Sequence, residues 1–212
     1  MINNFKKIFS STKPIVIAGP CSAESEKQVL ATAHELKKHS NLIFRAGIWK
    51  PRTRPNSFEG IGVEGLNWLK KVKDETGLKT TVEVAKAKHV ELAIKHDIDM
   101  LWVGARTTGN PFAIQEIADA LENTDITVLI KNPINPELNL WIGAIERLQD
   151  AGVYNIAAIH RGFFTYKNSK YRNIPQWQLA LDLKRKFPDL PMICDPSHIS
   201  GNRNLIMEIA QK

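Results

Sequence analysis

Positively charged side chains recur where short apolar runs of the sequence end. Arg106, Lys131 and Arg161 each follow such a run within three residues. Arginine can donate paired hydrogen bonds to a phosphate, and lysine supplies a compact charge. A lone arginine at such a position would be interpreted as half of a surface ion pair. Three cations in the same register would repel one another without an anion, so this set predicts a phosphate-binding pocket.

A second group of cations follows the second apolar run, Leu42–Ala46. Arg45 lies within the run, and the segment Lys50-Pro51-Arg52-Thr53 comes shortly after it. These residues predict a second anion-binding site. Glu83, in the third run, adds a carboxylate.

Cys21 and His198 are the candidate metal ligands. Cys21 follows the first apolar run, and His198 closes the segment Asp195-Pro196-Ser197-His198 after the seventh. A thiolate and an imidazole suit several divalent transition metals. The alternative interpretations are a buried free cysteine and a histidine that only caps the following helix. Cys194, inside the seventh run, is predicted to lie in the core.

These residues are separated by a regular alternation of predicted strands and helices. The strands are apolar throughout, which is typical of a parallel sheet covered on both faces. The predicted strands are residues 15–18, 42–46, 79–84, 99–103, 126–130, 154–159 and 191–194. The predicted helices are residues 22–40, 63–76 (stopped by Gly77), 85–96, a helix beginning at Asn110-Pro111, and residues 136–150, 175–187 and 202–211.

Two architectures fit this alternation: a (β/α)8 TIM barrel and an open doubly wound sheet. The segment Gly19-Pro20-Cys21-Ser22 lacks the glycine spacing of a dinucleotide-binding turn. In a barrel the carboxyl ends of all strands converge on one mouth, whereas an open sheet spreads them along an edge. Because the candidate site residues follow the strands, we predict a single barrel domain over residues 1–212, with only seven of the eight units.

The composition excludes several classes of protein. The chain has 212 residues, of which 43% are hydrophobic and 24% charged, so it can bury a core and disorder is not expected. It has no apolar run of membrane-spanning length and no secretory signal, so we expect no membrane association. Its net charge of +7 is compatible with nucleic-acid binding, but no block of five like charges occurs, so none is expected. The two separated cysteines favour a reducing, cytoplasmic compartment.

Six motifs together resemble one family, 3-deoxy-D-arabino-heptulosonate 7-phosphate (DAHP) synthase, and most closely its type I β subgroup. The motifs occur in the order of that family from about Lys13 to the C-terminus. They are residues 18–22 (AGPCS), 50–53 (KPRT), 104–106 (GAR), 131–133 (KNP), 160–162 (HRG) and 195–198 (DPSH). The sister enzyme that makes 3-deoxy-D-manno-octulosonate 8-phosphate is the second reading, because it shares the barrel but is expected to differ at Pro51-Arg52-Thr53.

The resemblance implies a condensation of phosphoenolpyruvate with erythrose 4-phosphate, the first step of the shikimate pathway. It implies that Arg106, Lys131 and Arg161, with the amide of Ala105, hold the phosphate of phosphoenolpyruvate. It also implies that Arg45 and Lys50 bind the carboxylate, with Lys50 as proton donor. Pro51, Arg52 and Thr53 would receive the sugar phosphate, and Glu83 would orient a water molecule.

The resemblance further implies a divalent metal (Mn, Fe, Zn, Co or similar) on Cys21 and His198, which would polarise the aldehyde. Two carboxylate ligands of the family lie on or after an eighth strand, and this sequence stops at Lys212 within the seventh unit. We therefore expect an incomplete barrel with poor activity by itself. The expected partners are the two substrates, further copies in a dimer or tetramer, and a fused or associated chorismate mutase.

Overall fold

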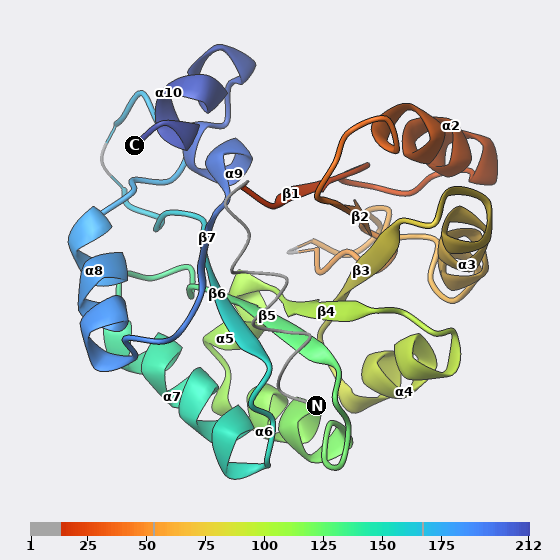
Figure 1. Ribbon diagram of the computed structural model, residues 1–212. Helices are drawn as coiled ribbons and strands as arrows, with labels where there is room; N and C mark the ends of the chain where they lie inside the picture. Colours follow the sequence, from red (N-terminus) through yellow and green to blue (C-terminus); the bar gives the residue numbers. More distant parts are fainter. Residues whose placement is uncertain (1–13, 53, 167) are drawn as a thin grey trace. The chain divides into compact units, whose positions relative to one another are not determined.

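The computed structural model describes residues 14–52, 54–166 and 168–212. Parallel strands alternate with helices along the chain, as Figure 1 shows. The strands are β1 (Val16–Ala18), β2 (Leu42–Ala46), β3 (Lys79–Val84), β4 (Met100–Val103), β5 (Thr127–Lys131), β6 (Ile156–His160) and β7 (Met192–Cys194). The helices are α2 (Glu26–Leu36), α3 (Glu64–Thr76), α4 (Ala87–Lys95), α5 (Ala105–Thr108), α6 (Pro111–Ala120), α7 (Leu138–Asp150), α8 (Trp177–Lys186), α9 (Pro196–Ser200) and α10 (Ile206–Ala210), with a 3-10 turn at Arg203–Leu205.

The chain divides into two compact units. The first unit comprises the chain up to Trp102 together with Thr124–Thr127. The second comprises Val103–Asn123 and Val128–Lys212. In the first unit β1, β2 and β3 lie side by side, with Ile17 beside Ile43 and Arg45 beside Thr81. In the second unit β5, β6 and β7 do the same, with Lys131 beside Ile159. Strand order therefore follows chain order in both units.

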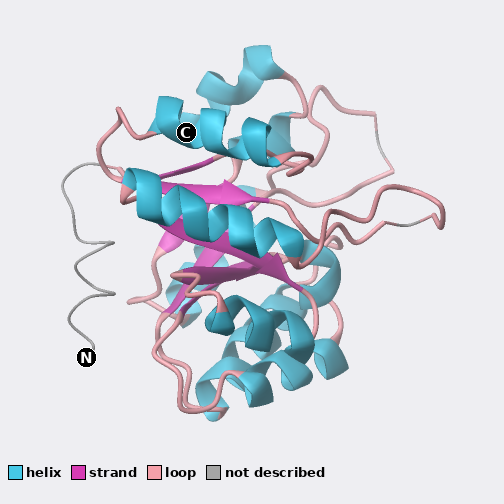
Figure 2. Cartoon of the chain, turned by 90° about the vertical axis from the view of Figure 1, so that its right-hand side faces the viewer, coloured by secondary structure: helices cyan, strands magenta, loops and turns pink. Residues whose placement is uncertain are grey.

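The apolar strands are buried, as their composition predicts. Every residue of β5 and of β6 is buried, which requires cover on both faces of the strands. Helices supply this cover, and α2 packs against α3 in the first unit while α7 packs against α6 and α8 in the second. Helix and strand make up most of the described chain, with loops between them (Figure 2). In the described residues β1 and β7 each have a neighbour on one side only, and Val16 is 46% exposed.

Capping residues mark the ends of several helices, although α2 (Glu26–Leu36) is shorter than the helix predicted over residues 22–40. Ser25 accepts a hydrogen bond from the amide of Gln28 at the start of α2. Asn110 accepts from the amides of Phe112 and Ala113, with Pro111 just inside α6. Gly77 ends α3 in the left-handed conformation, with φ of 71°.

The C-terminal region differs from the single predicted helix over residues 202–211. Gly201 adopts a left-handed φ of 64° and ends a short helix, α9, that the sequence pattern did not predict. The Asn202 side chain then caps a 3-10 turn, so that α10 begins only at Ile206. The local polar residues therefore break the apolar periodicity into three short pieces.

Candidate active site

In the first unit, Lys50 and Cys21 lie against each other beyond the carboxyl ends of β1 and β2. The ammonium nitrogen of Lys50 donates to the backbone carbonyl of Cys21 and lies 3.4 Å from its sulfur. The Cys21 side chain is exposed. The structure thus brings together a predicted proton donor and a predicted metal ligand that are 29 residues apart in the sequence.

Two glycines allow this close approach of the backbones. Gly19 has φ of 149°, and a Cβ atom there would overlap the carbonyl oxygen of Arg45. A Cβ atom on Gly47 would overlap the carbonyl oxygen of Cys21 and lie 3.1 Å from the Lys50 nitrogen. The segments after β1 and β2 can therefore interlock only because neither position has a side chain.

Arg45 and Glu83 meet at Trp102, also within the first unit. The Arg45 guanidinium lies over the Trp102 ring, 4.7 Å from its centroid, and the indole N–H donates to the Glu83 carboxylate at 3.2 Å. The Nε atom of Arg45 is buried and has no hydrogen-bond partner among the described residues. A buried arginine donor without a partner is suited to an anionic ligand.

The predicted sugar-phosphate segment is described in part. Arg52 is exposed, and its Nε atom donates to the Phe58 carbonyl at 2.9 Å, while Pro51 is half-buried. Thr53 lies outside the described residues, so its predicted role is untested by the structure.

In the second unit, Asp195 joins Lys131 to His198. One oxygen of Asp195 lies 3.1 Å from the Lys131 nitrogen and 2.7 Å from Nδ1 of His198. Its other oxygen accepts from the His198 amide at 3.1 Å. Burial by itself would raise the pKa of Asp195, but the hydrogen bond with His198 and the charge of Lys131 outweigh it and hold that pKa far below its usual value. Asp195 is therefore ionised.

The same contacts act on His198. The hydrogen bond with Asp195 raises the pKa of His198, but burial and the cations Lys131 and Arg161 together outweigh it and lower the pKa. The imidazole is thus predominantly neutral at pH 7, the form that binds metals.

Arg161 is buried, with 8% of its surface exposed, and is held by Asn132. The Asn132 side chain accepts from the Arg161 amide at 2.7 Å and donates to the carbonyl of Gly162 at 2.8 Å. Burial, helped by the charges of Arg172 and Arg106, lowers the pKa of Arg161 to about 10, although the charge of Asp195 acts in the opposite direction. Arg161 remains cationic at pH 7 and has an excess of positive charge around it.

Ala105 and Arg106 lie on α5, a short helix that the sequence pattern did not predict, and Arg106 is exposed. The sequence pattern did not single out Asn132, Asn173 or Arg172, which lie near Arg161 and His198. Asn173 is buried, and its side chain donates to the His198 carbonyl at 2.6 Å. Asn132 directly follows Lys131, and Asn173 directly follows Arg172. This adjacency to a cation was the signal in the sequence that could have identified the two asparagines.

Two other residues lie elsewhere than expected. Cys194 was predicted in the core but is exposed, because β7 has no strand beside it on its outer side among the described residues. His160 ends β6 but is buried, with Nε2 2.6 Å from the Pro175 carbonyl and the ring packed near Trp177. Through this contact with Pro175 it supports the loop after β6.

The metal prediction gains no further ligands from the described residues. No group of three or more histidine, cysteine, aspartate or glutamate side chains there could hold an ion. Cys21 belongs to the first unit and His198 to the second. Two candidate ligands do not make a metal site, since structural and catalytic sites use three or four protein ligands.

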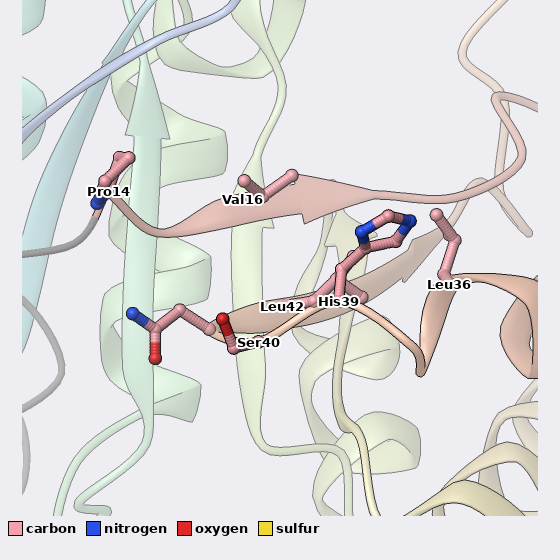
Figure 3. Close-up of a pocket in the computed structure, with 7 residues that line it drawn as sticks. Pro14, Val16, Leu36, His39, Ser40 and Leu42 are labelled. Atoms are coloured by element: carbon pink, nitrogen blue, oxygen red, sulfur yellow. The ribbon is translucent and has the colours of Figure 1, made fainter.

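A cavity of about 510 Å³ lies in the first unit at the opposite end of the strands (Figure 3). Pro14, Val16, His39 and Leu42 line it, near the amino ends of β1 and β2. Parallel barrels place chemistry at the carboxyl ends of the strands, where Cys21 and Lys50 lie, so this cavity is separate from the candidate site.

No helix within residues 14–52, 54–166 and 168–212 is long and apolar enough to cross a bilayer.

Comparison with known families gives one match that spans nearly the whole chain. The sequence profile described as the DAHP synthetase I family matches residues 6–212. The chain belongs to this family. The cation-rich segments of both units therefore lie within a DAHP synthetase I domain.

Individual relatives agree with the family. The phospho-2-dehydro-3-deoxyheptonate aldolase of Thermotoga maritima is 29% identical over 196 residues, which cover 92% of this chain and 56% of the relative. A crystal structure of that DAHP synthase has a TM-score of 0.81 at 28% identity and covers 93% of this chain and 56% of that one. The predicted fold class, a TIM barrel with seven units present, is confirmed by this likeness.

A second kind of relative also matches. A 2-dehydro-3-deoxyphosphooctonate aldolase of Caulobacter vibrioides is 31% identical over 201 residues, covering 91% of this chain and 66% of that protein.

A further solved structure, a truncated DAHP synthase from Thermotoga maritima, has a TM-score of 0.77 at 26% identity and covers 93% of this chain and 69% of that one. This DAHP synthetase I chain thus spans slightly more than half the length of the Thermotoga relative.

Proposed function

We propose that this chain takes part in DAHP synthesis. Phosphoenolpyruvate, erythrose 4-phosphate and water would give 3-deoxy-D-arabino-heptulosonate 7-phosphate and inorganic phosphate, the first step in the biosynthesis of aromatic amino acids. The observation that carries the proposal is the pair of buried cations Lys131 and Arg161 in the second unit of a DAHP synthetase I chain. Asp195 pairs with Lys131, and the positive charge that remains around the buried Arg161 favours an anionic ligand.

The second unit would bind the phosphate of phosphoenolpyruvate. The Lys131 ammonium is held by Asp195, and the Arg161 guanidinium donates to the Gly162 carbonyl at 3.1 Å, so both side chains are positioned before the ligand arrives. Arg106 and the amide of Ala105 would complete the phosphate contacts. Asp195 neutralises part of the charge of Lys131 but leaves the surroundings of Arg161 positive.

The first unit would supply the remaining contacts. The unpartnered Nε of Arg45 supports a carboxylate-binding role for that residue, and Lys50 would act both there and as a proton donor. Pro51, Arg52 and Thr53 would receive the sugar phosphate, and Glu83 would orient the water. In the reaction C3 of phosphoenolpyruvate attacks the aldehyde carbon, water adds at C2, and the C2–O bond to phosphate breaks with release of inorganic phosphate.

Cys21 and His198 remain the candidate ligands of a divalent metal, whose chemistry when bound would be polarisation of the aldehyde carbonyl. The described residues add no third histidine, cysteine or carboxylate ligand to these two. The proposed partners otherwise are the two substrates, further copies of the chain and a chorismate mutase, in the cytoplasm.

The second candidate function is 3-deoxy-D-manno-octulosonate 8-phosphate synthesis. The similarity to the Caulobacter aldolase supports it, and it would use the same phosphoenolpyruvate pocket with arabinose 5-phosphate. The segment Lys50-Pro51-Arg52-Thr53 favours the four-carbon sugar phosphate, as the family resemblance implies.

The decisive experiment offers both aldehydes to the purified protein with phosphoenolpyruvate and a divalent metal. We expect phosphate release with erythrose 4-phosphate to exceed that with arabinose 5-phosphate. Preference for the pentose phosphate would overturn the proposed sugar specificity. Phosphoenolpyruvate binding without turnover of either aldehyde would leave only the second unit's role supported.

A further inference from the structure

The loop between β6 and α8 contributes a fourth cation, Arg172, beside the phosphate pocket of the second unit. Arg172 is exposed, whereas Arg161 is buried. The charge of Arg172 is near enough to Arg161 to lower its pKa, and its influence exceeds that of Arg106. Arg106 is one of the three cations that the sequence pattern assigned to this pocket, and Arg172 acts on Arg161 in the same direction.

The backbone around Arg172 is fastened on both sides. Its amide donates to the Ser200 carbonyl at 3.3 Å, and the next amide, of Asn173, donates to Ile199 at 3.1 Å. Phe163 and Ile174 form an antiparallel bridge that closes the base of the loop. Arg172 is therefore fixed next to the segment that carries His198.

The aliphatic stem of Arg172 packs across Gly201. A Cβ atom on Gly201 would lie 2.5 Å from Cβ, 3.3 Å from Cγ and 3.2 Å from Cδ of Arg172. The absence of a side chain at Gly201 leaves room for the stem, which limits where the guanidinium can lie. Among the described residues, none of the ion pairs involves Arg172.

We propose that Arg172 is an additional anion-binding residue, whose guanidinium binds phosphate oxygens of the ligand held by Arg161 and Lys131. The inference rests on the proposed function and extends it to a residue on a different loop. The ligand class is a phosphate monoester or inorganic phosphate, because several cations converge on it and Asp195 offsets only part of their charge. Binding of such an anion removes the repulsion between Arg161 and Arg172.

The test is calorimetric titration of the 212-residue chain with phosphoenolpyruvate and, separately, with inorganic phosphate. Arg172→Met keeps an unbranched stem over Gly201 but removes the guanidinium. We expect the affinity for both anions to fall about ten- to hundred-fold, the range for losing a charged hydrogen bond. Arg172→Lys, which keeps the charge without the paired donors, should bind with intermediate affinity.

The matched control is Arg203→Met, which removes an exposed arginine from the 3-10 turn of the same unit. It should bind both anions as the unchanged protein does. Thermal unfolding without ligand should be the same for Arg172→Met and the unchanged protein, which separates a binding role from a folding role. Equal affinities for Arg172→Met and the unchanged protein would overturn this inference alone. Failure of the unchanged protein to bind phosphoenolpyruvate would overturn the proposed function as well.

Discussion

Lys131 and His198 contact the same carboxylate oxygen, Oδ2 of Asp195, at 3.1 and 2.7 Å. A single buried charge therefore fixes both the lysine proposed to bind phosphate and the histidine proposed to bind metal. Replacement of that charge should disturb stability and ligand binding together.

Asp195→Asn should destabilise the protein by about 3 kcal/mol or more, because it leaves Lys131 buried without its counter-ion. Urea unfolding at pH 7 measures this change. Since the pKa of Asp195 is far below that of an unfolded aspartate, the stabilisation is present above about pH 4 and is lost as the pH falls further. The difference between the two proteins should therefore shrink in acid. Asp182→Asn, which breaks an exposed pair with Arg185, should cost about 0.5 kcal/mol or less.

Arg161 and Lys50 should affect different kinetic constants. Arg161→Ala removes a phosphate contact, so the KM for phosphoenolpyruvate should rise about ten- to hundred-fold while that for the sugar phosphate stays nearly unchanged. Lys50→Met removes the proposed proton donor, so kcat should fall about 10²- to 10⁴-fold. Steady-state kinetics of the metal-loaded protein measure both. Identical effects of the two changes on both substrates would contradict the separate roles.

Asn132→Ala should weaken phosphate binding although its side chain is not predicted to touch the ligand. The change removes the acceptor for the Arg161 amide and a donor to Gly162, both in buried surroundings. We expect an affinity loss of about tenfold, accompanied by a loss of stability of about 1 to 3 kcal/mol. Calorimetric titration and urea unfolding provide the two values. Full phosphate affinity in a folded variant would show that Arg161 does not need this support.

The two cysteines should differ in their reaction with iodoacetamide. Cys194 is exposed at the outer side of β7, but partial burial of its thiol, followed by the charge of Asp195, raises its pKa to about 11. The thiol therefore stays protonated at pH 8 and becomes reactive only as the pH approaches 11. Cys21 is exposed beside the Lys50 ammonium and should be alkylated first at pH 8. Peptide mass spectrometry over a pH series gives both rates. Cys21 should react faster than Cys194 at every pH below 10. Faster labelling of Cys194 at pH 8 would contradict the prediction.

Metal binding should depend on Cys21 and not on Cys194. Cobalt(II) coordinated by a thiolate absorbs in the near ultraviolet, so titration with this ion reports the ligand directly. We expect weak binding that Cys21→Ser abolishes, while Cys194→Ser retains it. An unchanged absorption band in Cys21→Ser would exclude this cysteine as a ligand.

Strand identity was predictable because burial on both faces leaves a continuous apolar run, as in Thr127–Lys131 and Ile156–His160. The helix start at Asn110 was predictable because the Asn110 side chain caps it, whereas the helix predicted from residue 22 begins only after Ser25. The short helices α5 and α9 were not, because four or five residues are too few to show a helical period. Among the site residues, the cations were found by their position after strands. The asparagines that hold them were missed, because an amide's hydrogen-bond partners depend on tertiary contacts 25 to 30 residues away.

The glycines at positions 19 and 47 have a consequence for mutational scanning. Each lies against a carbonyl oxygen of a residue proposed to act on substrate or metal, Arg45 for Gly19 and Cys21 for Gly47. Any side chain would push those backbones apart, so even alanine should be rejected at both positions. A scan scored only by growth would therefore rank two residues without functional groups alongside Lys50 and Arg161. Intolerance to substitution in this part of the chain can thus result from steric overlap as well as from loss of a catalytic group. Measuring the amount of soluble protein for each variant distinguishes the two causes.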